Sequence, residues 1–98
     1  MDRASILDNA KKCVCGGREH DHGTPENNFA TIGQFWGTYL YAAYPDIKLP
    51  ENGISAKDVA VMMGLLKIAR IATGSSPDSY VDLAGYVACA GELSNQEK

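Results

Sequence analysis

Hydrophobic positions recur every three to four residues in four stretches of this chain, and this spacing predicts four helices. Their expected bounds are roughly residues 3–15, 25–43, 55–73 and 77–92. With 98 residues there is room for one domain only. We therefore predict an all-α fold, a compact four-helix arrangement that takes in the whole chain, 1–98.

The third stretch is apolar on nearly all sides. Its large hydrophobic residues cannot all fit on a stripe of about 100°, which is the width that a surface helix buries. They are Val59, Val61, Met62, Met63, Leu65, Leu66, Ile68 and Ile71. We expect the rest of the chain or a second copy to cover this helix on most sides, so a homo-oligomer is predicted.

The ends of the helices carry recognisable capping residues. Ser55 is an expected N-cap, and Gly74 follows the last periodic residue, where a left-handed C-cap is typical. The connection 74–76 is short, which predicts that the third and fourth helices form an antiparallel hairpin at the core. Thr24-Pro25 is typical of the start of the second helix, with a hydroxyl N-cap followed by a proline at the first helical position.

Charge and composition narrow the classes of partner. The formal net charge of −3 gives no electrostatic reason to expect DNA or RNA binding. We see no apolar run long enough for a membrane span and no export signal, and the three cysteines are an odd number. We therefore expect a protein of the host cytoplasm, in a reducing setting and without membrane contact.

The segment before the second helix is the strongest candidate for binding an anion. Arg18, His20, His22 and Thr24 precede a helix N-terminus, whose unpaired N–H groups and dipole attract phosphate.

Aromatic side chains farther along the second helix, Trp36 and Tyr39, could stack on a base. The alternative is structural: Arg18 pairs with a nearby acid, and the two rings belong to the core. Both interpretations remain open at this point.

Two cations interrupt the apolar third helix. Lys67 and Arg70 lie one turn apart, and counting outward from the short connection places them near Asp78 and Asp82. A structural ion-pair network is the favoured interpretation, because charges are costly to bury unless they are paired. The alternative is a ligand phosphate, which an arginine can bind with two hydrogen bonds.

A metal site has less support. Cys13, Cys15, His20 and His22 are suitable zinc ligands, but their spacing differs from that of common zinc motifs. If the first helix extends through Cys15, the two sulfurs point apart by about 200°. We expect no metal here, and we expect Cys89 to be a small core residue.

Six short stretches carry a family resemblance: Gly17-Arg18, HGTPENNF from His22, WGTYL from Trp36, KDVAVMM from Lys57, LKIAR from Leu66 and DSYVDLAGY from Asp78. Through these stretches the chain resembles a family of small phage and prophage proteins over roughly residues 3–90. The resemblance implies a phage origin and implies no particular reaction.

The helical pattern is also distantly similar to all-α nucleoside triphosphate pyrophosphohydrolases. Those enzymes hold Mg²⁺ with an E-x-x-E on one helix and an E-x-x-D on the next. This chain offers Asp58, Asp78 and Asp82 instead, which is a sparser set of carboxylates. Mg²⁺ is expected only under this alternative, and otherwise no cofactor.

These features favour binding over catalysis. Our leading hypothesis is a phage accessory protein that binds a nucleotide without hydrolysing it and sequesters a cyclic or modified nucleotide signal of host antiviral defence. Its ligand-binding residues would be Arg18, His20, His22, Thr24, Trp36, Tyr39, Lys67 and Arg70. Two alternatives remain, a Mg²⁺-dependent pyrophosphohydrolase and an adaptor that binds a host protein through the apolar helix.

Overall fold

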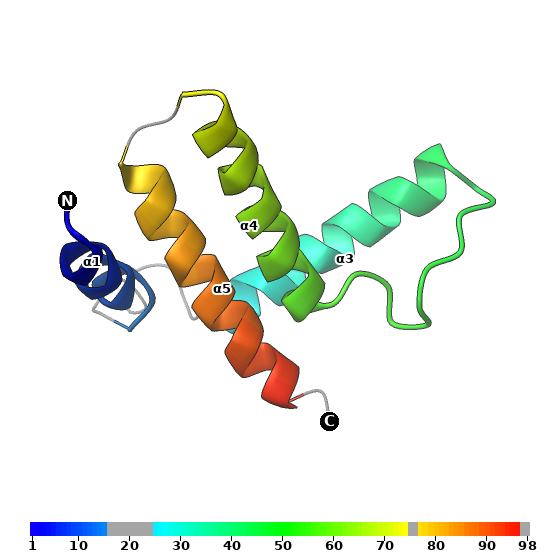
Figure 1. Ribbon diagram of the computed structural model, residues 1–98. Helices are drawn as coiled ribbons and strands as arrows, with labels where there is room; N and C mark the ends of the chain where they lie inside the picture. Colours follow the sequence, from blue (N-terminus) through cyan, green and yellow to red (C-terminus); the bar gives the residue numbers. More distant parts are fainter. Residues whose placement is uncertain (16–24, 75–76, 97–98) are drawn as a thin grey trace.

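The computed structural model describes residues 1–15, 25–74 and 77–96. These residues form four helices, α1 (Arg3–Cys15), α3 (Pro25–Ala43), α4 (Ala56–Ala72) and α5 (Asp78–Gln96) (Figure 1). The predicted all-α class is therefore confirmed for the part of the chain that is described. No helix in that part is long and apolar enough to cross a membrane.

Helices α4 and α5 form the hairpin at the centre of the molecule. They run in opposite directions, side by side, and share the most extensive contact between any two helices described (Figure 1). The Ser55 hydroxyl accepts a hydrogen bond from the Asp58 backbone N–H at 3.1 Å, which caps α4 as expected. Gly74 has a φ of 88°, the left-handed conformation predicted for the residue after the helix.

The other two helices pack onto this hairpin from different sides. Helix α1 lies against α5, where a Cβ at Gly85 would be 3.2 Å from a Val14 methyl group. Gly85 therefore lets a neighbouring helix approach closely.

At the start of α1, the Ser5 backbone N–H donates to Asp2 Oδ1 at 2.8 Å, which lowers the pKa of this exposed carboxyl below its ordinary value.

Helix α3 packs against α4 at one end, where it crosses the hairpin (Figure 1). The chain entering α4 lies so close to α3 that a Cβ at Gly33 would overlap the Ile54 carbonyl oxygen. A residue without a side chain is needed there because backbone occupies the space.

The core lies where these helices meet. Its buried members are Phe29 from α3, Val59 and Ala60 from α4, and Cys89 and Leu93 from α5. The Phe29 and Tyr86 rings pack with centroids 6.0 Å apart. Val59 and Ala60 are completely inaccessible to water, so the first two turns of α4 anchor the core.

Two expectations need correction. Helix α5 continues to Gln96 instead of ending near residue 92, because Leu93 is buried and holds the last turn against the core. The interpretation that places the Tyr39 ring in the core is wrong, because 65% of this residue is exposed.

The C-terminal half of α3 projects away from the rest of the molecule (Figure 1). The radius of gyration of 14.7 Å exceeds the value of about 13 Å for a compact domain of this length. Side chains on this projecting half therefore meet few neighbours from their own chain.

Replacing Gly33 with alanine should lower the free energy of unfolding by about 1–3 kcal/mol, because the added methyl group displaces the backbone at Ile54. Gly91→Ala is the matched control. Gly91 is exposed on α5 with open space around it, so the gain in helix propensity should raise stability by about 0.5–1 kcal/mol. Urea denaturation measures both, and a similar gain in the two variants would contradict the close approach at Gly33.

Candidate functional site: the outer face of helix α4

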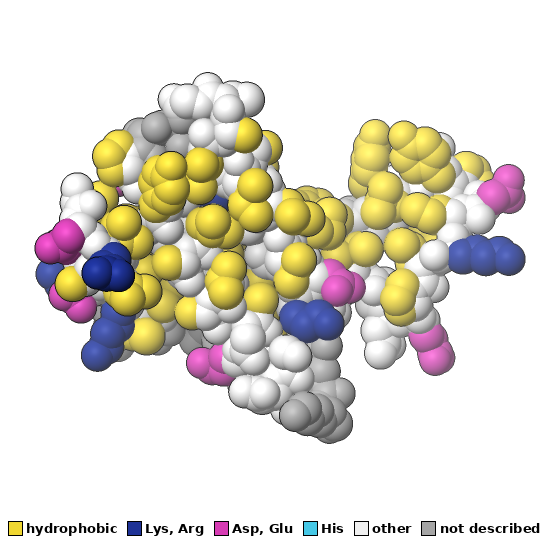
Figure 2. All heavy atoms as spheres, in the orientation of Figure 1, with side chains coloured by type: hydrophobic (Ala, Val, Ile, Leu, Met, Phe, Trp, Pro, Cys, Tyr) yellow, Lys and Arg dark blue, Asp and Glu magenta, His cyan; other side chains and the backbone are white. Residues whose placement is uncertain are grey.

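One side of α4 is apolar and open to solvent. We define the α4 outer face as the exposed residues on this side, Val61, Met62, Leu65, Leu66, Ile68, Ala69 and Ala72. Figure 2 shows hydrophobic side chains gathered over α4 and α5 at the middle of the visible face, with charged side chains mainly toward its margins. The helix that anchors the core on one side thus presents hydrophobic residues to water on the other.

No charged residue lies on this face between Val61 and Ala72. At 100° per residue, its members span about 160° of the helix circumference. Arg70 lies about 40° beyond one edge of this span, and Asp58 precedes its N-terminal end. The face is therefore an uninterrupted apolar surface, with Asp58 at one end and Arg70 beside it.

The basic residue in the middle of α4 points the other way. Lys67 Nζ is 3.1 Å from Asp82 Oδ2 on α5, and only 15% of the Lys67 side chain is exposed. The predicted proximity of Lys67 to Asp82 is therefore confirmed. A half-buried ion pair on the inside and an apolar outside invert the usual polarity of a surface helix.

A second group of exposed hydrophobic residues lies on the projecting half of α3. Phe35 and Tyr39 are four residues apart, so their rings lie on the same side of the helix, and both are mostly exposed. Tyr39 is thus available for contact, whereas Trp36 is half-buried and packs against the core.

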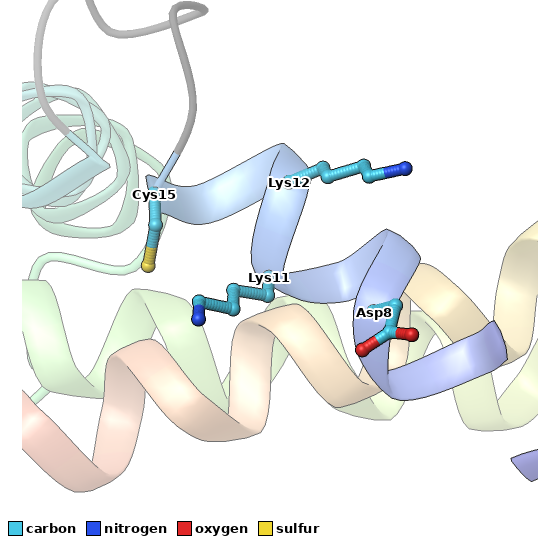
Figure 3. Close-up of a pocket in the computed structure, with 4 residues that line it drawn as sticks. All are labelled: Asp8, Lys11, Lys12 and Cys15. Atoms are coloured by element: carbon cyan, nitrogen blue, oxygen red, sulfur yellow. The ribbon is translucent and has the colours of Figure 1, made fainter. Parts of the chain in front are cut away.

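A different kind of surface lies at the end of α1. An open depression of 380 Å³ is lined by Asp8, Lys11, Lys12 and Cys15. In Figure 3, Lys11 and Cys15 point to the same side of the helix while Lys12 extends away. The two lysines did not figure among the expected ligand-binding residues, although the spacing of the four residues, i, i+3, i+4 and i+7, places them on one helix face.

The predicted anion-binding residues Arg18, His20, His22 and Thr24 lie outside the described residues, so their role stays a prediction. Tyr39 is 14 residues beyond Pro25, or about 21 Å along the helix.

Helix geometry also separates the carboxylates of the Mg²⁺ alternative. Asp58 is in the first turn of α4 and Asp78 begins α5 beyond the last turn, so about 20 Å lies between them. Asp82 is engaged with Lys67. The structure does not bring the three together, and among the described residues no group of three or more His, Cys, Asp or Glu side chains is placed to hold a metal.

The cysteines behave as their positions in the helices predict. Helix α1 does extend through Cys15, and Cys13 and Cys15 are both exposed. Their histidine partners in the zinc hypothesis lie outside the described residues. Cys89 is buried in the core, as predicted.

Asp82→Asn should destabilise the protein more than Lys67→Met does. The asparagine leaves the half-buried ammonium of Lys67 without its partner, which should cost about 1–2 kcal/mol. A methionine at position 67 keeps the apolar stem and leaves Asp82 in contact with water, so its cost should stay below about 1 kcal/mol. Equilibrium denaturation measures the loss in free energy of unfolding for both variants. A larger loss in Lys67→Met than in Asp82→Asn would show that the ion pair is not what makes the half-buried position of Lys67 tolerable.

Comparison with known proteins places this helical chain among phage proteins. It is 40% identical over 90 residues to the Gene 55 protein of Mycobacterium phage D29, covering 91% of this chain and 53% of that protein. It is 39% identical over 85 residues to the Gene 55 protein of Mycobacterium phage L5, covering 84% of this chain and 47% of that protein. The chain thus spans about half the length of these two relatives.

No solved structure shows a significant match. The expected resemblance to phage proteins is confirmed, whereas the distant similarity to pyrophosphohydrolases stays a prediction. The sequence pattern of one family, described as a domain of unknown function (DUF6378), matches residues 5–94, nearly the whole chain. The chain therefore belongs to the DUF6378 family.

Proposed function

We propose that this chain is a phage accessory protein that acts by binding another protein chain through the α4 outer face. The observation that carries the proposal is the exposure of Val61, Met62, Leu65, Leu66 and Ile68 on the same helix whose first turns anchor the core. This gives the adaptor alternative more support than it had from the sequence alone.

The size and chemistry of the face suit a protein partner. Its five large side chains present on the order of 400 Å² of apolar surface, and patches of this size on soluble proteins are often functional. Side chains that offer no hydrogen bonds contribute little free energy to the binding of a polar small molecule. They contribute more when they pack against another apolar surface and both are removed from water. An oligomer of this chain is part of the same proposal.

We do not propose the pyrophosphohydrolase activity. It requires carboxylates that act together on one Mg²⁺ ion, and Asp58 and Asp78 lie at opposite ends of the helical hairpin.

A photo-crosslinking amino acid at position 65 should join the protein to a discrete partner chain when producing cells are irradiated. Leu65 is 59% exposed at the middle of the α4 outer face. Mass spectrometry of the crosslinked band identifies the partner, whether it is this chain or another protein.

The matched control carries the same amino acid at position 7. Leu7 is 63% exposed on α1, so it is as accessible as Leu65 but lies on a different helix. Diffuse crosslinking of equal yield at both positions would contradict a dedicated surface on α4.

We also propose, as a second function, that the protein binds and sequesters a cyclic or modified nucleotide of host defence. The supporting observation is that Lys11 and Lys12 flank the depression at the end of α1, directly before the segment that carries Arg18, His20 and His22. Five potential cations thus fall within twelve consecutive residues, although the net charge of the chain is negative.

A panel of linear and cyclic nucleotides should contain one that raises the melting temperature of the protein. The double substitution Lys11→Ala and Lys12→Ala should weaken that binding at least tenfold, because each lysine contact to a phosphate contributes on the order of 1 kcal/mol. Lys48→Ala, an exposed lysine in the connection between α3 and α4, is the control and should have no effect. No thermal shift at ligand concentrations far above micromolar would rule out nucleotide binding.

A further inference from the structure

We propose that the α4 outer face is covered by the α4 outer face of a second copy of this chain, with the two helices antiparallel across a two-fold axis beside Leu65. The inference rests on the protein-binding function proposed above and names its partner. Four observations carry it: the small core, the absence of charge at the centre of the face, the position of Asp58 at one end of it and the area available.

The first observation is that the chain has little core of its own. Among the described residues, Val59 is the only large side chain that is fully buried, and the outer half of α4 contributes nothing to the interior. A chain of about 100 residues is modestly stable even when it is well packed. A partner that covers α4 would raise the stability of the folded chain, and a second copy is present wherever the chain itself is.

The second observation concerns the centre of the face. In a two-fold pair, a residue on the axis meets its own counterpart, so a charged residue there would repel itself. The centre of the α4 outer face offers Met62, Leu65 and Leu66. Leucine and methionine pack well against their own kind, whereas a partner rich in charged groups would find no opposite charge at this centre.

The third observation is the position of Asp58 at one end of the face. At 100° per residue, Asp58 lies in line with the middle of the face, seven residues before Leu65. A parallel pair would bring this carboxylate next to its own copy, whereas an antiparallel pair about Leu65 places the two Asp58 residues at opposite ends.

The fourth observation is area. The α4 outer face supplies on the order of 400 Å², about half of the roughly 800 Å² that each partner buries in a standard interface. The projecting half of α3 carries more exposed aromatic surface at Phe35 and Tyr39. A second copy that covered both the α4 outer face and these two rings would bury an area close to that of a standard interface.

Sedimentation equilibrium of the purified chain tests the proposal. We expect a dimer at micromolar concentration, and we expect Leu65→Glu to raise the dimer dissociation constant at least a hundredfold, because it places two carboxylates at the axis. Leu7→Glu adds the same charge to an equally exposed position on α1 and should leave the dimer intact. Circular dichroism establishes whether any variant has lost its helices.

A wild-type chain that is folded and monomeric at all concentrations would overturn the second copy as partner. If position 65 is nevertheless crosslinked to a different protein in cells, the protein-binding function stands and only its partner changes. If the folded monomer also gives no discrete crosslink, both proposals fail.

Discussion

The burial of the first turns of α4 is the constraint on which the rest of the structure depends. Val59 and Ala60 are completely enclosed, and Phe29, Cys89 and Leu93 from two other helices close around them. Gly33 is required at this point because the chain entering α4 runs directly against α3. Once one end of α4 is held this tightly, its remaining turns have a fixed direction and a fixed outer side.

That fixed direction explains the inverted polarity of the helix. Lys67 falls on the side toward α5, where it is tolerated because Asp82 is 3.1 Å away. The opposite side receives only Val, Met, Leu, Ile and Ala between positions 61 and 72. Burying a cation while exposing five large hydrophobic residues is unfavourable for an isolated chain, and it becomes favourable when an apolar surface covers the exposed side.

The features that the sequence predicts well are local ones. Ser55 and Gly74 set the ends of α4 through their own hydrogen bonds and backbone conformation, and a short connection is enough to imply an antiparallel hairpin. The uncovered side of α4 was not predictable, because periodicity shows that the helix is apolar all round without showing which side the chain covers. The projection of α3, which leaves Tyr39 exposed, depends on packing between distant residues in the same way.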